Sequence, residues 1–151
     1  MNLKPLMTMH ADLNESVPVG VGPNGNRMIA DVTGGYFEGE KLKGEVLASG
    51  ADWVTIDSEG VGHLDVRIAL RTDDGAHIYV QYFGVLIFND KVNDSFAGIK
   101  PAEFGDTYFM TQPRFETGDE RYKWLNRTVA VAEGRPLQNA VEYQVFEVTN
   151  N

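Results

Sequence analysis

The sequence predicts an all-β fold, a sandwich or a barrel, and two observations carry this prediction. Apolar and polar residues alternate with a period of two through most of the chain, as in "HLDVRIALRTDDG" at residues 63–75. This alternation is typical of a strand that turns one face to an apolar core. Turn signals rich in Gly, Asp, Asn and Pro recur about every 8 to 12 residues, which is the spacing of strands in all-β domains.

The first predicted strands lie between breaks that are rich in glycine or proline. We expect a loop at residues 17–23 and a break at Gly34-Gly35, with Gly39 and Gly44 as bend points. The last two strands of this half pair across the turn "SEG". In order, these strands cover residues 3–10, 28–32, 36–46, 53–57 and 63–71.

An Asp-Gly hairpin turn then leads into "IYVQYFGVLIF". Thr117 and Glu120 have capping-box spacing in "TGDERYKWLN", which predicts one short helical segment. Residues 93–105 form a long connection with a possible helical turn before Pro101, the kind of loop that often acts as a lid or rim. The strands of this half cover residues 78–88, 108–115, 127–132 and 141–148.

Composition limits the class of protein. The chain has 151 residues, 42% hydrophobic and 23% charged, which predicts a single domain over residues 1–151. The net charge of -9 argues against nucleic acid and anionic membranes as partners, because both are bound through clustered Lys and Arg. The absence of cysteine excludes disulfides, thiolate metal sites and cysteine nucleophiles. The beginning, "MNLKPLMTMHADL", lacks the apolar run of a signal peptide, so we expect a cytoplasmic protein.

Four runs in order closely resemble the DUF3237 family, also called UPF0311: "GGYFEGEKLKGEVL", "GADW", "LDVRIALRTDDGAHIYV" and "PRFETGDERYKWLNRTV". The resemblance extends from about Arg27 to Val148. It implies a calycin-like antiparallel β-barrel of about eight strands. It implies little about activity, since barrels of this shape include both ligand carriers and enzymes, and fold alone does not choose between them.

The two rows of residues 63–71 raise the question of which one faces the inside of the barrel. We expect Asp65 and Arg67 to point inward with Trp53, Tyr79 and Arg114, because mixed aromatic, polar and charged rows are typical of ligand pockets. The same mixture occurs in the row of Tyr79, Gln81 and Phe83 and in the row of Tyr108, Met110, Gln112 and Arg114. The alternative is that Leu64, Val66, Ile68 and Leu70 fill the barrel and the charged row is solvated.

Family members often look basic where this chain has Gln81, Phe83 and Met110. If those rows line the pocket, the resemblance implies a less cationic cavity than in the relatives. Such a cavity would suit a largely apolar or aromatic ligand with one or two polar groups.

Several side chains are candidates for acid–base chemistry. Asp52 could be a general base beside Trp53, whose indole would raise the carboxyl pKa by desolvation; alternatively, Asp52 caps a turn. Asp65 could be a base with Arg67 positioning an anion, or the two could form a structural ion pair. Tyr79 could donate a proton to an oxyanion, or make an ordinary hydrogen bond.

The segment "PRFETGDERYKWLN" could be a lid, with Arg114 and Trp124 reaching the ligand, or a plug that closes one barrel end. The three histidines, His10, His63 and His77, are dispersed, so no metal site is predicted. No nucleotide or nucleophile motif is present.

We therefore expect cofactor-independent acid–base catalysis on a small, largely apolar or aromatic molecule inside the barrel, by isomerisation, cyclisation or elimination. Asp52 or Asp65 would be the base, and Tyr79 with Arg67 or Arg114 would stabilise the anion. The other expected substrate-binding residues are Trp53, Gln81, Phe83, Met110 and Trp124. The alternatives are a non-catalytic small-molecule binder and a structural oligomer with a vestigial pocket. An apolar row on the outer face would need cover, which predicts a homodimer or larger oligomer.

Overall fold

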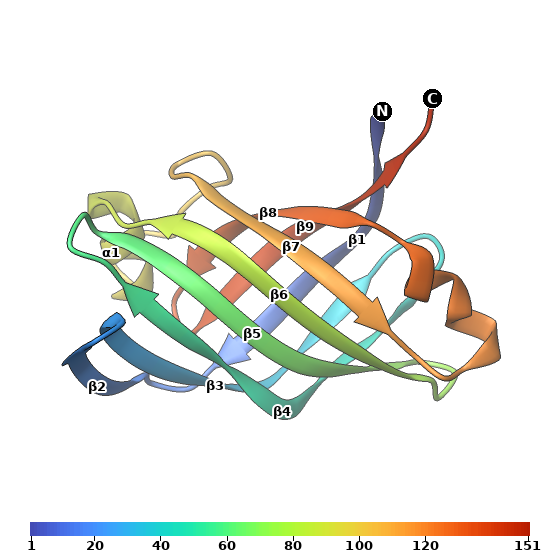
Figure 1. Cartoon of the computed structure of the whole chain (residues 1–151), viewed down its shortest axis with the longest axis horizontal. Coiled ribbons are helices and arrows are strands. Elements are labelled where there is room, and N and C mark those ends of the chain that lie inside the picture. The colour runs from blue at the N-terminus through green and yellow to red at the C-terminus, as the bar shows by residue number, and fades with distance from the viewer.

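The computed structural model describes all 151 residues and is a closed antiparallel β-barrel of eight strands with one extra strand (Figure 1). All strands belong to one sheet in the order β1-β9-β8-β7-β6-β5-β4-β3-β2, and the pairing of β1 with β3 closes it. The strands are β1 (Asn2–Leu13), β2 (Val17–Gly22), β3 (Gly25–Glu38), β4 (Lys43–Ile56), β5 (Val61–Thr72), β6 (His77–Ile87), β7 (Phe109–Glu116), β8 (Ala130–Leu137) and β9 (Ala140–Thr149). The helices are α1 (Asp90–Phe96) and the 3-10 helix η1 (Glu120–Arg127). The predicted all-β barrel is confirmed.

Two predictions about strand ends are wrong. Residues 17–22 form β2, which pairs with β3 as a hairpin outside the closed barrel. Strand β3 continues through Gly34-Gly35, because its register against β4 shifts between Asp31 and Tyr36 and the strand bends there without ending. A Cβ at Gly35 would lie 1.9 Å from the His10 carbonyl oxygen. Glycine is therefore required where the barrel wall turns sharply.

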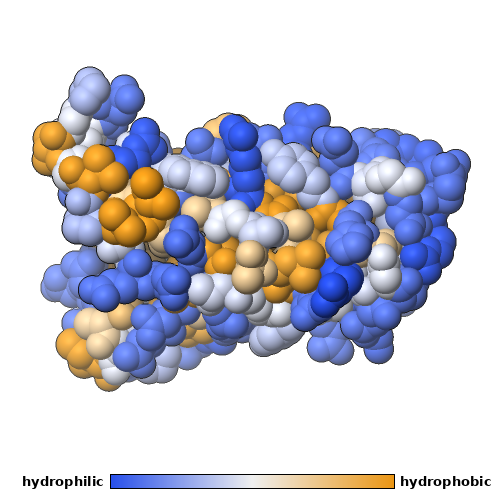
Figure 2. Space-filling model, turned by 90° about the horizontal axis from the view of Figure 1, so that it is seen from below, coloured by the Kyte–Doolittle hydropathy of each residue, from blue (hydrophilic) through white to orange (hydrophobic).

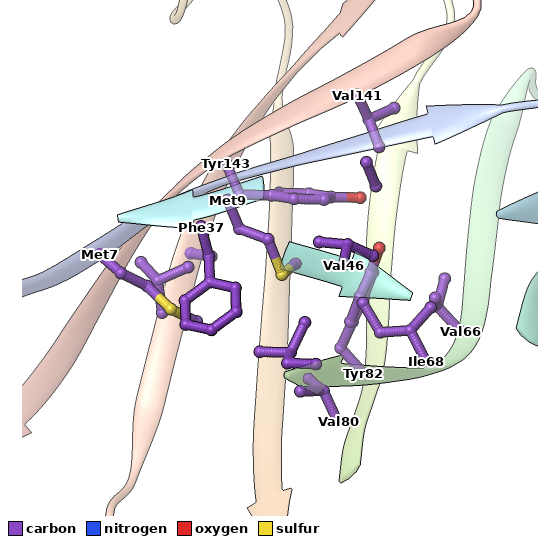
Figure 3. Packing of buried hydrophobic residues seen from close by; sticks show 14 of the residues in the cluster. Met7, Met9, Phe37, Val46, Val66, Ile68, Val80, Tyr82, Val141 and Tyr143 are labelled. Carbon is purple, nitrogen blue, oxygen red and sulfur yellow. The ribbon is translucent and has the colours of Figure 1, made fainter. Parts of the chain in front are cut away.

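The apolar row of β5 fills the barrel. Leu64, Val66, Ile68 and Leu70 are all buried and belong to one core cluster with residues from β1, β3, β6 and β9. Figure 3 shows Val66 and Ile68 packed in this cluster. The expectation that the charged row faces inward is wrong. Burial of the apolar row gains hydrophobic free energy, whereas an inward row of charges would have to be desolvated and paired.

The two ends of the barrel are closed differently. Helix α1 lies at the left end in Figure 1, where Val92 and Ser95 are buried. Helix η1 lies at the right end and inserts Leu125 into the core, with Asp119 as its N-cap in place of the expected Thr117. Both chain termini leave the barrel close together. No helix is long and apolar enough to cross a membrane.

Hydrophobic atoms also reach the surface at the left end of the barrel. Figure 2 shows them gathered there and in the middle of the face seen from below, whereas the right end is hydrophilic. Strand β2 lies at this end and exposes Val17, Val19 and Val21. The α1 end of the barrel therefore has an apolar rim.

Candidate functional site

A cavity of about 660 Å³ opens at the α1 end of the barrel. Its walls come from the inward rows of β3, β4, β5 and β6, and its rim comes from the β1–β2 loop, α1 and the β8–β9 turn. Twelve of its 18 lining residues are hydrophobic, and the only ionisable ones are Asp52 and Glu15. The hydrophobic lining residues are Leu13, Met28, Ala30, Val54, Leu64, Leu86, Phe88, Phe96, Ala97, Phe109, Ala140 and Val141.

Asp52 is placed in this cavity by the register of β4. It faces Ala30 on β3 and Val66 on β5, and it shares the inward row with Val54. Its Oδ1 atom accepts a hydrogen bond of 3.2 Å from the backbone N–H of Asp65. Its Oδ2 atom has no hydrogen-bond partner in the chain, so one carboxylate oxygen is held and the other is free for a ligand.

The surroundings of Asp52 favour its protonated form. Burial among apolar side chains raises the pKa of its carboxyl from 3.8 to about 7. The hydrogen bond from the Asp65 N–H opposes this rise in pKa, and the negative charge of Asp65 adds to it. A carboxyl with a pKa near neutrality is suited to take up and return protons at physiological pH.

Two buried tyrosines extend the polar groups of the interior. Tyr82 lies in the same cross-strand row as Asp52, with Val66 between them. Its ring meets that of Tyr143 edge-on at 5.3 Å, and Tyr143 in turn meets Phe109 at 5.4 Å. Figure 3 shows the two tyrosines entering from different strands with their hydroxyl ends on the same side of the view.

Burial raises the pKa of both tyrosine hydroxyls above the ordinary value, and the charge of Asp52 raises each further. Both are therefore hydrogen-bond donors throughout the neutral range. The Tyr143 hydroxyl has no hydrogen-bond partner; Tyr82 is close enough to influence its pKa, but the pair does not reach hydrogen-bond geometry. A buried hydroxyl without a partner is costly and rare in proteins.

The other residues predicted for the site lie mostly on the outer face. Arg67 is exposed, and Trp53 and Asp65 are half-buried on the outward rows of β4 and β5. The Oδ1 atom of Asp65 is buried without a hydrogen-bond partner. Of these residues, Asp65 alone touches the site, through its backbone N–H.

The mixed rows of β6 and β7 also face outward. Tyr79, Phe83, Met110 and Arg114 are exposed, and Gln81 accepts a hydrogen bond of 3.2 Å from the Tyr79 hydroxyl. Phe83 and Met110 line a separate outer groove of about 670 Å³. These side chains do not enter the barrel, because the strand parity that buries Leu64 and Val66 also buries Tyr82 and exposes its neighbours.

The segment with Trp124 closes the end of the barrel opposite the cavity. Of the two alternatives for this segment, a lid or a plug, it is therefore the plug. Trp124 packs against the core and lies 4.2 Å beneath the Lys41 ammonium. Tyr122 and Arg121 hold the segment to the β5–β6 turn through Asp74. No group of three or more His, Asp or Glu side chains converges in a way that could hold a metal ion.

Sequence reasoning singled out Asp52, which lines the cavity, but it did not single out the buried Tyr82 and Tyr143. The signal for Tyr82 was present in "IYVQYFGVL": the row of Ile78, Val80, Tyr82 and Leu86 is the more apolar one. Choosing the apolar row of β5 as the inward one would have placed Tyr82 in the barrel. No signal in the sequence brings Tyr143 to Asp52, because β9 and β4 are not neighbours in the sheet.

Comparison with known proteins gives one consistent family. The model of the family described as "Protein of unknown function (DUF3237)" matches residues 1–148. A UPF0311 protein from Rhodopseudomonas palustris is 30% identical over 148 residues, covering 98% of this chain and 97% of the relative. A crystal structure of a "beta-barrel like protein" from Acinetobacter baumannii has a TM-score of 0.85 and 39% identity, covering 98% of this chain and 96% of that chain.

Two fungal proteins are more distant. A protein from Penicillium roqueforti named "PR-toxin biosynthesis cluster protein 7" is 26% identical over 143 residues, covering 82% of this chain and 77% of its own length. The crystal structure of "an enzyme from Penicillium herquei" has a TM-score of 0.70 and 21% identity, covering 98% and 94% of the two chains. At this identity the second likeness shows the fold alone.

Proposed function

Because this chain belongs to the DUF3237 family, whose name assigns no activity, we propose its function from its own cavity: acid–base catalysis on a small, largely apolar or aromatic molecule. Asp52 is the proton-transferring group. The observation that carries the proposal is a carboxyl with one free oxygen, facing an apolar cavity, with a pKa of about 7.

The proposed step is a proton transfer. The free Oδ2 of ionised Asp52 takes a proton from an acidic C–H or O–H of the substrate, and the electron pair of that bond stays on the substrate as an oxyanion. The hydroxyls of Tyr82 and Tyr143 are the donors proposed to stabilise it. Asp52 then returns the proton at a second atom, which gives isomerisation. Alternatively, a leaving group departs with the electron pair of its bond and takes the proton from Asp52, which gives elimination.

Neither tyrosine lines the cavity itself, but Tyr143 packs edge-on against Phe109, which does. The unpartnered Tyr143 hydroxyl is the reason for assigning them a role. A ligand oxygen that reaches this depth would satisfy a donor that the chain itself leaves unsatisfied.

One fungal relative supports an enzyme more than a carrier, because it takes its name from a toxin biosynthesis cluster. The competing function is binding without turnover, in the manner of a lipocalin, and the same cavity would serve it.

Exchange of carbon-bound hydrogen tests the proposal without knowledge of the natural substrate. 2-Tetralone is a neutral aromatic ketone with acidic C–H groups, and its incubation with the protein in D₂O can be followed by proton NMR. We expect hydrogen–deuterium exchange faster than in buffer, and at least about tenfold slower with Asp52→Asn, since a general base contributes about 10²–10⁴-fold. Binding of the ketone without catalysed exchange would support the carrier function instead.

A matched pair of probes tests the proposed ligand class. N-Phenyl-1-naphthylamine is neutral, and 8-anilino-1-naphthalenesulfonate carries a sulfonate on the same skeleton. No Lys, Arg or His lines the cavity, so we expect the neutral probe to bind at least tenfold more tightly at pH 8. Asp52→Asn should narrow this difference, since it removes the negative charge from the wall. Equal affinities for the wild-type protein would contradict a cavity selective for neutral molecules.

A further inference from the structure

The β4–β5 ladder is interrupted beside Asp52. The two strands pair from Gly50 to Asp52 and again from Thr55, but the pairs between these positions are absent. At this register Trp53 faces Asp65, and in a regular ladder the Asp65 N–H would donate to the Trp53 carbonyl.

Two side chains take the places of the missing partners. The Asp65 N–H donates to Oδ1 of Asp52 at 3.2 Å, and the Trp53 carbonyl accepts from Nη1 of Arg27 at 2.6 Å. Arg27 comes from β3, where it faces Thr55, and its only side-chain hydrogen bond is this one. Both backbone groups are thus satisfied although they do not bond each other.

We propose that Arg27 is a positioning residue for Asp52: by occupying the Trp53 carbonyl, it keeps the ladder open and leaves the Asp65 N–H to hold one carboxylate oxygen. This inference rests on the proposed role of Asp52 as the proton-transferring group. Arg27 itself lies on the outward row of β3 and does not line the cavity. It acts on the site through the backbone of Trp53 and Asp65.

The arrangement has a chemical consequence. A carboxylate held by an amide N–H keeps its free oxygen in one orientation, and the hydrogen bond stabilises the ionised form. Without Arg27, the Trp53 carbonyl would need another donor, and the nearest in register is the Asp65 N–H. A hydrogen bond from the Asp65 N–H to the Trp53 carbonyl would remove this donor from Asp52 and raise the pKa of the Asp52 carboxyl further.

Other charged and titratable groups around Asp52 are unchanged by removal of Arg27. They are Asp65 on β5, Tyr82 on β6, Tyr143 on β9 and Glu15 at the cavity rim. Their influence on the Asp52 pKa is therefore common to the wild-type protein and the variants.

The test compares Arg27→Met with Arg67→Met. Arg67 lies on the next strand but one, is exposed and makes no side-chain hydrogen bond, so its substitution controls for loss of a surface guanidinium. The titration of Asp52 is followed by carbon-13 NMR of the carboxyl, which needs no substrate. We expect the Asp52 midpoint to rise by about one pH unit in Arg27→Met and to stay within 0.2 unit of wild type in Arg67→Met.

Amide hydrogen exchange of Asp65 supplies a second measurement. In the wild-type protein its protection should fall when Asp52 becomes protonated, because its acceptor is weakened. In Arg27→Met it should be independent of that titration, because the acceptor is the Trp53 carbonyl.

Arg27→Lys keeps a donor and should restore the wild-type behaviour of both readouts. If Arg27→Met does not fold, Arg27→Leu takes its place as the variant without a donor. An Asp52 midpoint in the variant without a donor equal to that in Arg67→Met, or Asp65 exchange that still follows the Asp52 titration in the variant without a donor, would overturn the proposal. Neither readout involves turnover. The role of Arg27 can therefore be confirmed or overturned whether or not the protein proves to be an enzyme.

Discussion

Burial of the Asp52 carboxyl suits it to proton transfer, but it costs folding free energy whenever the carboxyl is ionised. Its carboxyl is the one charged side chain on the inward rows of the strands, and its pKa is raised mainly by burial. Groups of this kind cluster at functional sites, where desolvation is tolerated for the chemistry that it allows.

Activity should follow the ionisation of Asp52. If its carboxylate is the base, the rate of 2-tetralone exchange should rise with pH through a midpoint of about 7 and level off above it. The measurement is the pH dependence of the exchange rate between pH 5 and 9, corrected for exchange in buffer. A profile that is flat over this range would exclude Asp52 as the base.

Removing the charge of Asp52 should stabilise the fold at high pH. The folded pKa of about 7 exceeds the ordinary value of 3.8. The carboxyl therefore contributes stability that is present below the ordinary pKa and is lost as the pH rises through the folded pKa. Asp52→Asn escapes this loss and can still accept from the Asp65 N–H. We expect its melting temperature to match wild type near pH 4 and to exceed it at pH 8, where its free energy of unfolding should be higher by about 4 kcal/mol. A variant less stable than wild type at pH 8 would contradict the burial of a charge.

Tyr143→Phe should separate function from stability. The substitution keeps the ring that packs on Tyr82 and Phe109 and removes a hydroxyl without a partner. Stability should be unchanged or higher, because a buried unsatisfied group costs about 1–3 kcal/mol. Hydrogen exchange into 2-tetralone should slow at least about tenfold if the hydroxyl stabilises the oxyanion. Thermal unfolding and the exchange rate are measured on the same sample, and a rate equal to wild type would remove Tyr143 from the mechanism.

At the scale of elements, the register of strand β5 determines which of its two rows of side chains faces the core. Its inward residues pack in the core cluster, while Asp65 and Arg67 lie outside it. Since the side-chain period is two, a shift by one residue would reverse both rows.

Substitutions on the two faces of β5 should differ accordingly. Leu70→Ala removes a fully buried side chain and should cost about 2–5 kcal/mol in the free energy of unfolding. Arg67→Ala removes an exposed side chain and should change it by less than about 0.5 kcal/mol. Urea denaturation measures both, and comparable losses would mean that the outer face is also covered.

For the whole molecule, the outer face of the barrel carries an apolar region. It is not the row of Leu64 to Leu70 on β5, which was expected there and is buried in the barrel. Phe83 is 55% exposed, and it shares the outer groove with Met110, Leu3 and Phe146. The groove has no Lys or Arg, and its titratable side chains are Glu133, His63 and Tyr108. In a chain with a net charge of -9, a face with one carboxylate side chain brings few like charges together when two copies meet.

We therefore propose that a second copy of the chain covers this groove. Light scattering at micromolar concentration should give a mass above the 16.7 kDa of one chain, and Phe83→Glu should shift it toward that value. Val21→Glu, at an exposed valine outside the barrel, is the matched control and should leave the mass unchanged. A monomeric wild-type protein would exclude this interface.

The sequence by itself determined the fold class and most strand positions, and it singled out Asp52 as a candidate base. Alternation of period two is a local property, and a strand needs nothing more to divide its residues between two faces. Asp52 stood out because a carboxyl beside a glycine bend and an indole is unusual wherever the strand lies.

Only the tertiary structure decided which face became the interior and which groups joined Asp52 there. Either row of β5 could have lined the interior until closure of the barrel removed one of them from solvent. Removal from solvent favours the row of Leu64 and Val66 over the row of charges. Tyr143 reaches the same interior from the far end of the chain through the pairing of β9 with β1 and β8. The exchange of partners among Arg27, Trp53, Asp52 and Asp65 depends on hydrogen-bond register, which arises only when three strands are laid side by side.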